Sequence, residues 1–163
     1  MEILFILSGE HETLPTAEII ACLETEKTSF TVKYQNKGIL ILKIPDEESK
    51  IIDSIGKRIA YTHEVCKLLF KTTNDSMNKD IKKYPWNNVI HNDYAVRVKR
   101  IGLDPNFNSQ EMEIKIGGII KIILGDKAKV NLENPETFLR TVVLDNKILV
   151  CERLIKRSKK HYY

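Results

Sequence analysis

Apolar residues follow two kinds of pattern along this chain. Continuous or alternating apolar runs predict strands, and apolar residues spaced three or four positions apart predict helices. The run "EILFILSG" ends at Gly9 and indicates a buried strand. The next segment, "TLPTAEIIACLE", has helical spacing, with Thr13 as the expected N-cap and Pro15 in the first turn. The chain therefore begins with a predicted strand and a predicted helix.

Two more strands are predicted in "SFTVKYQNKGILILKI", where Asn36 and Gly38 are expected to supply the positive φ angles of a tight hairpin. The next segment, "DEESKIIDSIGKRIAY", opens with acidic residues that suit a helix N-terminus, and an apolar strand follows over residues 64–70. The order strand, helix, strand, strand, helix, strand is that of a ferredoxin-like unit. We therefore expect a small ferredoxin-like domain over residues 1–72.

Residues 71–93 are polar and are interrupted by Pro85, which predicts either a linker or one short helix near residues 79–84 with Trp86 as an apolar anchor. The segment "YAVRVKRI" then alternates as a strand does. Three short strands, "KVNL", "TFLRTVVL" and "ILVC", come later and are separated by the turns "ENPE" and "DNK". The second half of the chain is therefore expected to build its own sheet.

A helix is predicted between these strands, over residues 109–124. Asn108 and Glu111 have the spacing of a capping box at its start, and Gly125 suits its end. The pair Gly117-Gly118 costs the helix roughly 1 kcal/mol per glycine relative to alanine. We therefore expect another element to approach the helix closely at this pair.

The expected fold class is α+β with two small domains. The ferredoxin-like domain is followed by an α/β domain over residues 73–153, and residues 154–163 are assigned to a basic tail or the start of a linker. The length of 163 residues accommodates two small domains. No apolar run approaches the roughly 18 residues of a membrane span, and the acidic residue after Met1 argues against a secretory signal. We therefore expect a cytoplasmic protein with no membrane partner.

Charge is distributed unevenly along the chain, whose net charge is +4. Residues 1–74 carry 9 Lys/Arg against 11 Asp/Glu, a balance of −2, and residues 75–163 carry 17 against 11, a balance of +6. A basic excess attracts nucleic acid, although a solvated charged face and a frayed tail give the same composition. Tyr162, Tyr163 or Trp86 could stack on an unpaired base. The residues expected to contact RNA phosphates are Arg97, Lys99, Arg100, Lys121, Lys127, Lys129, Arg140, Arg153, Lys156 and Arg157.

Catalytic motifs are almost absent from the chain. It has no G-x-G-x-x-G after a strand, no phosphate-binding G-x-x-x-x-G-K-[ST] loop and no H-E-x-x-H metal helix. The cluster "SGEHE" places Glu10 and His11 just after the first strand, but neighbouring residues rarely converge on one reacting atom, so a loop and helix-cap role is expected. The three cysteines stand far apart, which predicts reduced thiols rather than a zinc site or disulfides. We expect no metal site and no catalysis by this chain alone.

The whole pattern resembles a known family. The segment "ILSGEHETLPTAEIIACLE" resembles the opening of archaeal tRNA guanosine N2-methyltransferases that modify position 10. The segments "YAVRVKRIG", "EIKIGGIIKI" and "KVNLENPETFLRTVVLDNKILVC" resemble successive parts of a THUMP domain, so the resemblance covers nearly the whole chain. Proteins of this family place a small ferredoxin-like domain before the THUMP domain, and the two together bind tRNA at the acceptor stem and the unpaired 3′ CCA end.

The resemblance implies that this chain is the tRNA-binding half of such an enzyme, either a fragment or a separately encoded subunit. The family's catalytic domain uses SAM, but this chain has neither a glycine-rich SAM loop nor an Asn/Asp-Pro-Pro-aromatic motif, since "NLENPE" has one proline and no aromatic residue after it. The resemblance therefore implies no cofactor in this chain and a methyltransferase domain or subunit as its partner. Thiouridine synthases, pseudouridine synthases and deaminases also carry THUMP domains, and a protein-interaction module that uses an open sheet edge is a further alternative.

Overall fold

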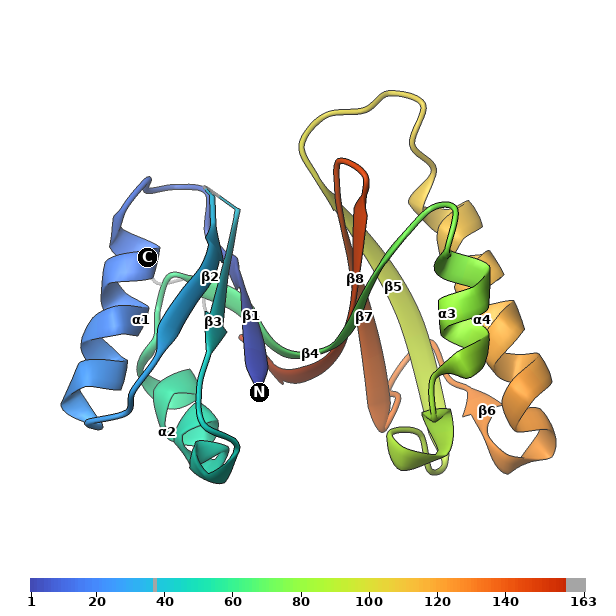
Figure 1. Ribbon diagram of the computed structural model, residues 1–163, viewed down its shortest axis with the longest axis horizontal. Coiled ribbons are helices and arrows are strands. Elements are labelled where there is room, and N and C mark those ends of the chain that lie inside the picture. Colours follow the sequence, from blue (N-terminus) through green and yellow to red (C-terminus); the bar gives the residue numbers. More distant parts are fainter. Residues whose placement is uncertain (37, 158–163) are drawn as a thin grey trace. The chain divides into compact units, whose positions relative to one another are not determined.

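In the computed structural model, which describes residues 1–36 and 38–157, the chain forms two compact units (Figure 1). Unit 1 contains Met1–Lys67 and the described residues from Arg153 onwards. Unit 2 contains Leu68–Glu152. Each unit encloses a hydrophobic core of its own.

Two long strands contribute residues to both units. They are β4 (Thr62–Thr73) and β8 (Lys147–Lys156). Residues 154–156, which we assigned to a basic tail or linker, are the end of β8 and belong to unit 1. The rest of that tail beyond residue 157, with the stacking candidates Tyr162 and Tyr163, lies outside the described residues.

The other elements of unit 1 are β1 (Glu2–Leu7), α1 (Leu14–Thr25), β2 (Thr31–Gln35), β3 (Ile39–Lys43), the 3₁₀ turn η1 (Asp46–Glu48) and α2 (Lys50–Arg58). Neighbouring strands pair antiparallel in the order β2-β3-β1-β4. In this order β3 is inserted between β1 and β2, which is the split β-α-β arrangement of a ferredoxin-like fold. The predicted ferredoxin-like architecture is therefore confirmed.

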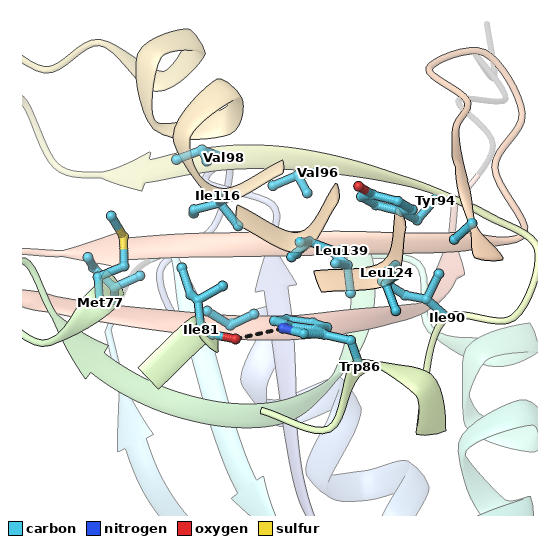
Figure 2. Packing of buried hydrophobic residues seen from close by; sticks show 14 of the residues in the cluster. Met77, Ile81, Trp86, Ile90, Tyr94, Val96, Val98, Ile116, Leu124 and Leu139 are labelled. Atoms are coloured by element: carbon cyan, nitrogen blue, oxygen red, sulfur yellow. Dashed lines mark hydrogen bonds between the residues drawn. The ribbon is translucent and has the colours of Figure 1, made fainter. Parts of the chain in front are cut away.

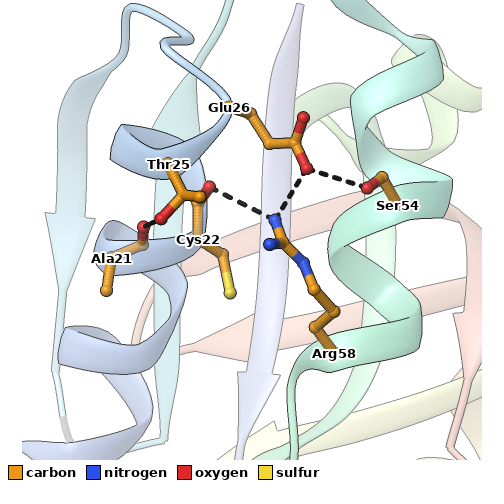
Figure 3. Close-up of polar contacts among 6 residues, drawn as sticks. All are labelled: Ala21, Cys22, Thr25, Glu26, Ser54 and Arg58. Atoms are coloured by element: carbon orange, nitrogen blue, oxygen red, sulfur yellow. Dashed lines mark hydrogen bonds and ion pairs between the residues drawn. The ribbon is translucent and has the colours of Figure 1, made fainter.

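Helices α1 and α2 cover one face of this sheet because each carries an apolar stripe. Ile19 of α1 belongs to the same core as Phe5 of β1. Polar contacts hold the C-terminal end of α1 to α2 (Figure 3). Arg58 donates to Glu26 Oε1 at 2.8 Å, and Ser54 Oγ donates to the same oxygen at 2.9 Å. One carboxylate at the end of α1 thus joins two turns of α2.

Two local details of unit 1 differ from expectation. Thr13 precedes α1 as predicted, but its side chain makes no capping hydrogen bond. At the β2–β3 hairpin Asn36 is not among the residues with a positive φ, so the prediction is wrong for Asn36, and for Gly38, which follows the undescribed Lys37, it stays a prediction. The Asn36 side chain shapes the turn instead, because its Oδ1 accepts from the backbone N–H groups of Gly38 and Ile39 at 2.8 Å each. Lys37 lies outside the described residues.

The other elements of unit 2 are α3 (Met77–Lys83), η2 (Trp86–Asn88), β5 (Asp93–Ile101), α4 (Ser109–Leu124), η3 (Gly125–Lys127), β6 (Lys129–Val130) and β7 (Thr137–Leu144). Its strand order is β4-β8-β7-β5-β6. Strand β5 is parallel to β6 and β7, and β7 is antiparallel to β8. Helices α3 and α4 pack on one face of these strands (Figure 1). The ferredoxin-like unit and this α/β unit confirm the predicted α+β fold class.

Trp86 anchors the core of unit 2, as predicted (Figure 2). Its side chain is 1% exposed, and its indole N–H donates to the carbonyl oxygen of Ile81 at 2.7 Å. The rings of Tyr84 and Phe70 pack on it, with centroids 4.7 and 6.0 Å away. The short helix predicted near residues 79–84 is α3, which the tryptophan thus ties to the core.

Helix α4 begins and ends where the sequence predicts. The Asn108 side chain accepts from the backbone N–H of Glu111 at 3.1 Å, and Gly125 ends the helix with a φ of 57°. Strand β6 is shorter than the predicted "KVNL" segment because the chain turns at Asn131. None of the helices in the described residues is long and apolar enough to cross a membrane.

Candidate nucleic-acid interface

A groove of about 370 Å³ lies between α4 and the strands β5 and β6 of unit 2. Ile114 and Gly118 line it on the helix side, and Val96, Val130 and Leu132 line it on the strand side. Ile114, Val130 and Leu132 are 68%, 52% and 58% exposed, so apolar surface faces solvent along the groove. Concave apolar surface with a few polar groups at its rim is typical of binding sites.

At the glycine pair of α4, no side chain projects from the helix into this groove. A Cβ atom added to Gly118 would meet no heavy atom within 4 Å, and one added to Gly117 would lie 3.9 Å from Val96 Cγ2, which is an ordinary contact. The expected close approach of another element is therefore wrong. Helix backbone lines the groove instead. Tyr94 Oη donates to the carbonyl oxygen of Gly117 at 3.2 Å, and burial raises the pKa of this tyrosine, so it keeps its proton at neutral pH.

The turn after β6 places Leu132 beside the groove. Asn131 Oδ1 accepts from the backbone N–H of Asn134 at 3.2 Å, and Asn131 Nδ2 donates to Asp93 Oδ2 at 3.0 Å. The other oxygen of Asp93 accepts from the backbone N–H of Glu136 at 2.6 Å. Side-chain hydrogen bonds from the start of β5 thus hold both ends of the turn, which needs no ligand to keep its shape.

Replacing Asp93 with asparagine should remove a pH-dependent part of the stability of unit 2. Hydrogen bonds from the Asn131 side chain and from the Glu136 N–H hold the pKa of Asp93 below its usual value of 3.8. A carboxylate whose pKa is lowered by folding stabilises the folded state above its unfolded pKa, and that contribution is lost as pH falls through the folded pKa. Urea unfolding of the two proteins from about pH 7 to about pH 2.5 should show a stability difference that shrinks only below about pH 4.

Asp75→Asn provides the control for this experiment. Asp75 is an exposed aspartate of the same unit, in the turn between β4 and α3. Its replacement should leave the pH dependence of unfolding as in the wild type. A stability difference between wild type and Asp93→Asn that stays constant down to the lowest pH would contradict the role given to the carboxylate.

Basic residues gather near the C-terminal end of α4. Lys121 lines the groove, and its Nζ donates to the carbonyl oxygens of Gly125 at 2.8 Å and Ala128 at 3.0 Å. Lys127 and Lys129 flank Ala128 in the chain, and both are exposed. Lys121 therefore satisfies carbonyl groups at the helix end, and the lysines on either side of Ala128 add positive charge next to it.

Arg97 and Glu113 lie toward the other end of the groove. Arg97 Nη1 is 3.3 Å from Glu113 Oε2, and Glu113 Oε1 accepts from the backbone N–H of Val98 at 3.0 Å. Strand β6 pairs only with the first two residues of β5. In the described sheet, the Val98 N–H therefore lies on an open edge of β5, where the Glu113 carboxylate accepts from it in place of a neighbouring strand. Gln110 is exposed and lines the same part of the groove, so amide and carboxylate acceptors lie together there.

Arg97 and Arg140 are paired in register on the neighbouring strands β5 and β7. Like charges opposite each other destabilise a sheet, but each guanidinium here has its own compensating contact. Arg97 pairs with Glu113, and Arg140 lies over the Phe138 ring at 5.0 Å from the centroid. Lys99 follows Arg97 by two residues, so it lies on the same face of β5, and it is exposed. Three of the predicted RNA-contacting residues thus share one face.

The other residues predicted to contact RNA either form ion pairs within their own unit or belong to unit 1. Arg100 Nη2 is 3.9 Å from Asp104 Oδ2, and its side chain is 19% exposed. Arg153 belongs to unit 1, where its Nη1 is 3.7 Å from Glu64 Oε1. Lys156 and Arg157 are exposed and also belong to unit 1. The structure therefore does not bring all ten candidates together, and their contacts with RNA stay predictions.

The fold also redistributes the charge. Among the described residues, unit 1 contains 10 Lys/Arg against 11 Asp/Glu, a net charge of −1, and unit 2 contains 13 against 11, a net charge of +2. The balance of +6 in residues 75–163 thus falls to +2 in unit 2, partly because Arg153, Lys156 and Arg157 belong to unit 1. The positions of individual basic residues around the groove therefore indicate a site for an anionic partner better than the net charge of either half of the sequence does.

The cluster at residues 8–12 forms the loop between β1 and α1. Ser8 is buried, and its Oγ accepts from the backbone N–H of Glu10 at 3.4 Å. Glu10 and His11 are exposed, and the His11 ring meets the Tyr61 ring edge-on at 5.4 Å. Over residues 1–36 and 38–157, no group of three or more His, Cys, Asp or Glu side chains could hold a metal ion. The contacts of Ser8 and His11 agree with the loop role predicted for this cluster.

Several groove residues were not among the predicted site residues. They include Gln110, Ile114, Val130 and Leu132. One of them carries a signal in the sequence. Ile116, Ile120 and Leu124 form the buried stripe of α4, and Ile114 is out of phase with that stripe. An isoleucine on the polar side of an amphipathic helix indicates apolar surface kept outside the core.

Known proteins resemble this chain along its length. The THUMP domain family matches residues 71–151. The tRNA (guanine(10)-N2)-dimethyltransferase of Methanothermobacter thermautotrophicus is 32% identical over 162 residues, which cover 99% of this chain and 46% of that relative. The chain spans about half the length of the curated relatives that it matches.

Solved structures share the fold. TrmN from Thermus thermophilus has a TM-score of 0.70 at 14% identity, and the match covers 96% of this chain and 46% of the TrmN chain. A 4-thiouridine synthetase, solved as a complex with RNA and ATP, has a TM-score of 0.58 at 18% identity, over 93% of this chain and 41% of its own. Residues 71–151, which include α4 and the groove, are therefore a THUMP domain.

Proposed function

We propose that this chain is the tRNA-binding part of a tRNA-modifying enzyme that methylates a guanosine at N2. The observation that carries the proposal is the 32% identity, over 99% of this chain, to a tRNA (guanine(10)-N2)-dimethyltransferase. The fold alone does not distinguish the reactions of THUMP enzymes, because a 4-thiouridine synthetase has the same fold at 18% identity. Sequence identity along nearly the whole chain favours the methyltransferase class.

Within this proposal, the interface in unit 2 binds the acceptor stem and the unpaired 3′ CCA end. Exposed lysines suit RNA phosphates because each contact releases condensed counterions. Lys99, Lys127 and Lys129 are exposed, and Arg97 is 39% exposed. The apolar groove suits a single-stranded end, since proteins read unpaired bases by packing on their faces and read duplex RNA mainly by shape. The two kinds of surface lie within one unit.

The proposed mechanism is selection by distance. A module that holds the 3′ end fixes one point of the folded tRNA, so a catalytic domain at a set distance meets the same nucleotide whatever the base sequence between them. The transferred methyl group would come from SAM. We assign SAM binding to a methyltransferase domain or subunit other than this chain, because the sequence has no glycine-rich loop and no Asn/Asp-Pro-Pro-aromatic motif.

A titration with two RNAs tests the proposal. Mature tRNA and the same tRNA without its CCA end should be titrated with the chain at about 0.1 M salt, and the dissociation constants compared. We expect the shortened tRNA to bind about tenfold more weakly, because the base packing at the 3′ end is lost. Equal affinity for both, or no binding of either, would contradict recognition of the 3′ end.

A further inference from the structure

We infer that strand β2 of unit 1 is an edge closed to further strands, and that Lys33 keeps a second copy of this chain from pairing with it. Within the described sheet β2 pairs with β3 alone, so its outer side is an open edge. Such an edge carries unpaired backbone groups that can pair with another chain. The inference goes beyond the proposed function and does not depend on it, because it concerns unit 1 and no RNA.

Most side chains of β2 would favour such pairing. All five of its residues are exposed, and Val32 and Tyr34, which are residue types common in strands, are 43% and 38% exposed. The neighbouring strand β3 is an apolar run, whose residues 39–42 are each at most 2% exposed. An exposed edge strand beside an apolar strand is a place where chains associate unless a feature of the edge prevents it.

A β-bulge at Lys33 is the first such feature. Val32 lies opposite Leu42 of β3, and Tyr34 lies opposite Ile41, the residue before Leu42 in the chain. This register leaves Lys33 as an extra residue with no position opposite it on β3. A regular strand would place Val32 and Tyr34 on the same face, but the bulge puts them on opposite faces. An incoming strand therefore meets no continuous ladder along β2.

The charge of Lys33 is the second feature. Lys33 is exposed and is the middle residue of β2, and the other four residues of the strand are uncharged. If two copies paired antiparallel about the middle of β2, their Lys33 ammonium groups would come together near the two-fold axis. Like charges opposite each other destabilise a pair of strands, and a lysine on an edge strand commonly prevents such pairing. One residue thus supplies both the bulge and the charge.

The turn after β2 keeps this strand on the sheet. Asn36 Oδ1 accepts from the backbone N–H groups of Gly38 and Ile39, and Asn36 Nδ2 donates to Tyr34 Oη at 3.2 Å. These bonds tie the end of β2 to the start of β3, so the apolar strand β3 stays covered by a strand that carries a charge. A closed β2 also counts against the alternative in which this edge binds a strand of a partner protein.

Removing Lys33 tests the inference. Deletion of Lys33 leaves the four residue pairs between β2 and β3 in register and removes both the bulge and the charge. Lys33→Thr removes the charge and keeps the extra residue. In sedimentation velocity runs from about 10 to about 500 µM, we expect a monomeric wild type and a deletion variant that forms dimers or larger species as its concentration rises. Lys33→Thr should associate more than the wild type and less than the deletion variant.

Lys43→Thr is the matched control, because Lys43 is an exposed lysine of β3, which has a strand on either side. It should stay monomeric. Amide hydrogen exchange locates the contact, since association through β2 should slow exchange in β2 and leave exchange in unit 2 unchanged.

Three results would overturn the inference. They are Lys33 variants that both stay monomeric throughout the concentration range, a Lys43→Thr protein that associates as strongly as they do, and slowed exchange at a surface other than β2. A wild type that already associates through β2 would overturn it as well. If deletion of Lys33 lowers the melting temperature, Lys33→Thr alone decides. None of these measurements involves tRNA, so the inference and the proposed function can fail separately.

Discussion

Trp86→Ala is expected to lower the free energy of unfolding of unit 2 by about 3–5 kcal/mol, which is the usual cost of removing a large aromatic side chain from a packed core. The indole is 1% exposed and packs with the rings of Phe70 and Tyr84. Its removal would leave a cavity and would also leave the Ile81 carbonyl oxygen without its 2.7 Å hydrogen bond. Urea unfolding followed by far-UV circular dichroism measures the loss.

Trp86→Phe separates the two contributions to this loss. Phenylalanine keeps most of the ring packing and removes the indole N–H. Trp86→Phe should therefore lower the free energy of unfolding less than Trp86→Ala does, because it leaves the Ile81 carbonyl unsatisfied but opens a smaller cavity. The wild-type transition can be assigned to unit 2 by fluorescence, because Trp86 is the single tryptophan of the chain. A Trp86→Ala protein within about 1 kcal/mol of the wild type would show that the indole does not hold α3 and η2 in the core.

Exchange of Lys127 and Lys129 together for glutamine is expected to weaken tRNA binding about tenfold at 0.1 M salt. Both side chains are exposed, and they flank Ala128, whose carbonyl oxygen accepts from the groove residue Lys121. If each lysine neutralises one phosphate, the slope of log affinity against log salt should become shallower by about two units. Titrations at several salt concentrations measure both quantities.

Lys79→Gln with Lys82→Gln is the matched control for this pair. Both residues are exposed lysines of unit 2, on α3, so the double variant changes the net charge of the unit by the same amount. It should leave the salt slope near the wild-type value, because neither lysine lines the groove. If the two double variants weaken binding equally, net charge and not position controls affinity, and the interface assigned to unit 2 is wrong.

Local signals in the sequence predicted much of this fold. The cap residues Asn108 and Gly125 gave the limits of α4 because capping depends on residues within one turn of the helix. The apolar runs of β1 and β3 predicted buried strands, and their order with α1 and α2 predicted the ferredoxin-like unit. Each of these features depends on neighbours a few residues apart, which a sequence displays directly.

Features that depend on distant parts of the chain were not predicted. The end of β8 packs against α2 in unit 1, where a Cβ added to Gly56 would lie 2.1 Å from Ile155 Cδ1, and nothing near either residue in the sequence indicates the other. The ion pair of Arg153 with Glu64 is equally remote. The groove arises only when the turn after β6 comes beside α4, so its members look like unrelated surface residues in the sequence.

The same reasoning explains why the candidate site was only partly predictable. A count of basic residues assigned a polyanion partner to the second half of the sequence, yet unit 2 has a net charge of only +2, because Arg153, Lys156 and Arg157 belong to unit 1. Arg100 and Arg153 are mostly covered by their own units, whereas Lys99 and Lys127 are exposed. Composition identifies residue types, and only the packing decides which of them face solvent.

Chemical shift mapping tests most directly whether unit 2 holds the 3′ end of an RNA. The ¹⁵N-labelled chain should be titrated with an acceptor-stem minihelix that ends in CCA, and again with the same minihelix blunt-ended. We predict that the backbone amides of Gly117, Gly118, Val130 and Leu132 shift with the first RNA and not with the second. Equal shifts with both RNAs, or shifts confined to unit 1, would contradict the account.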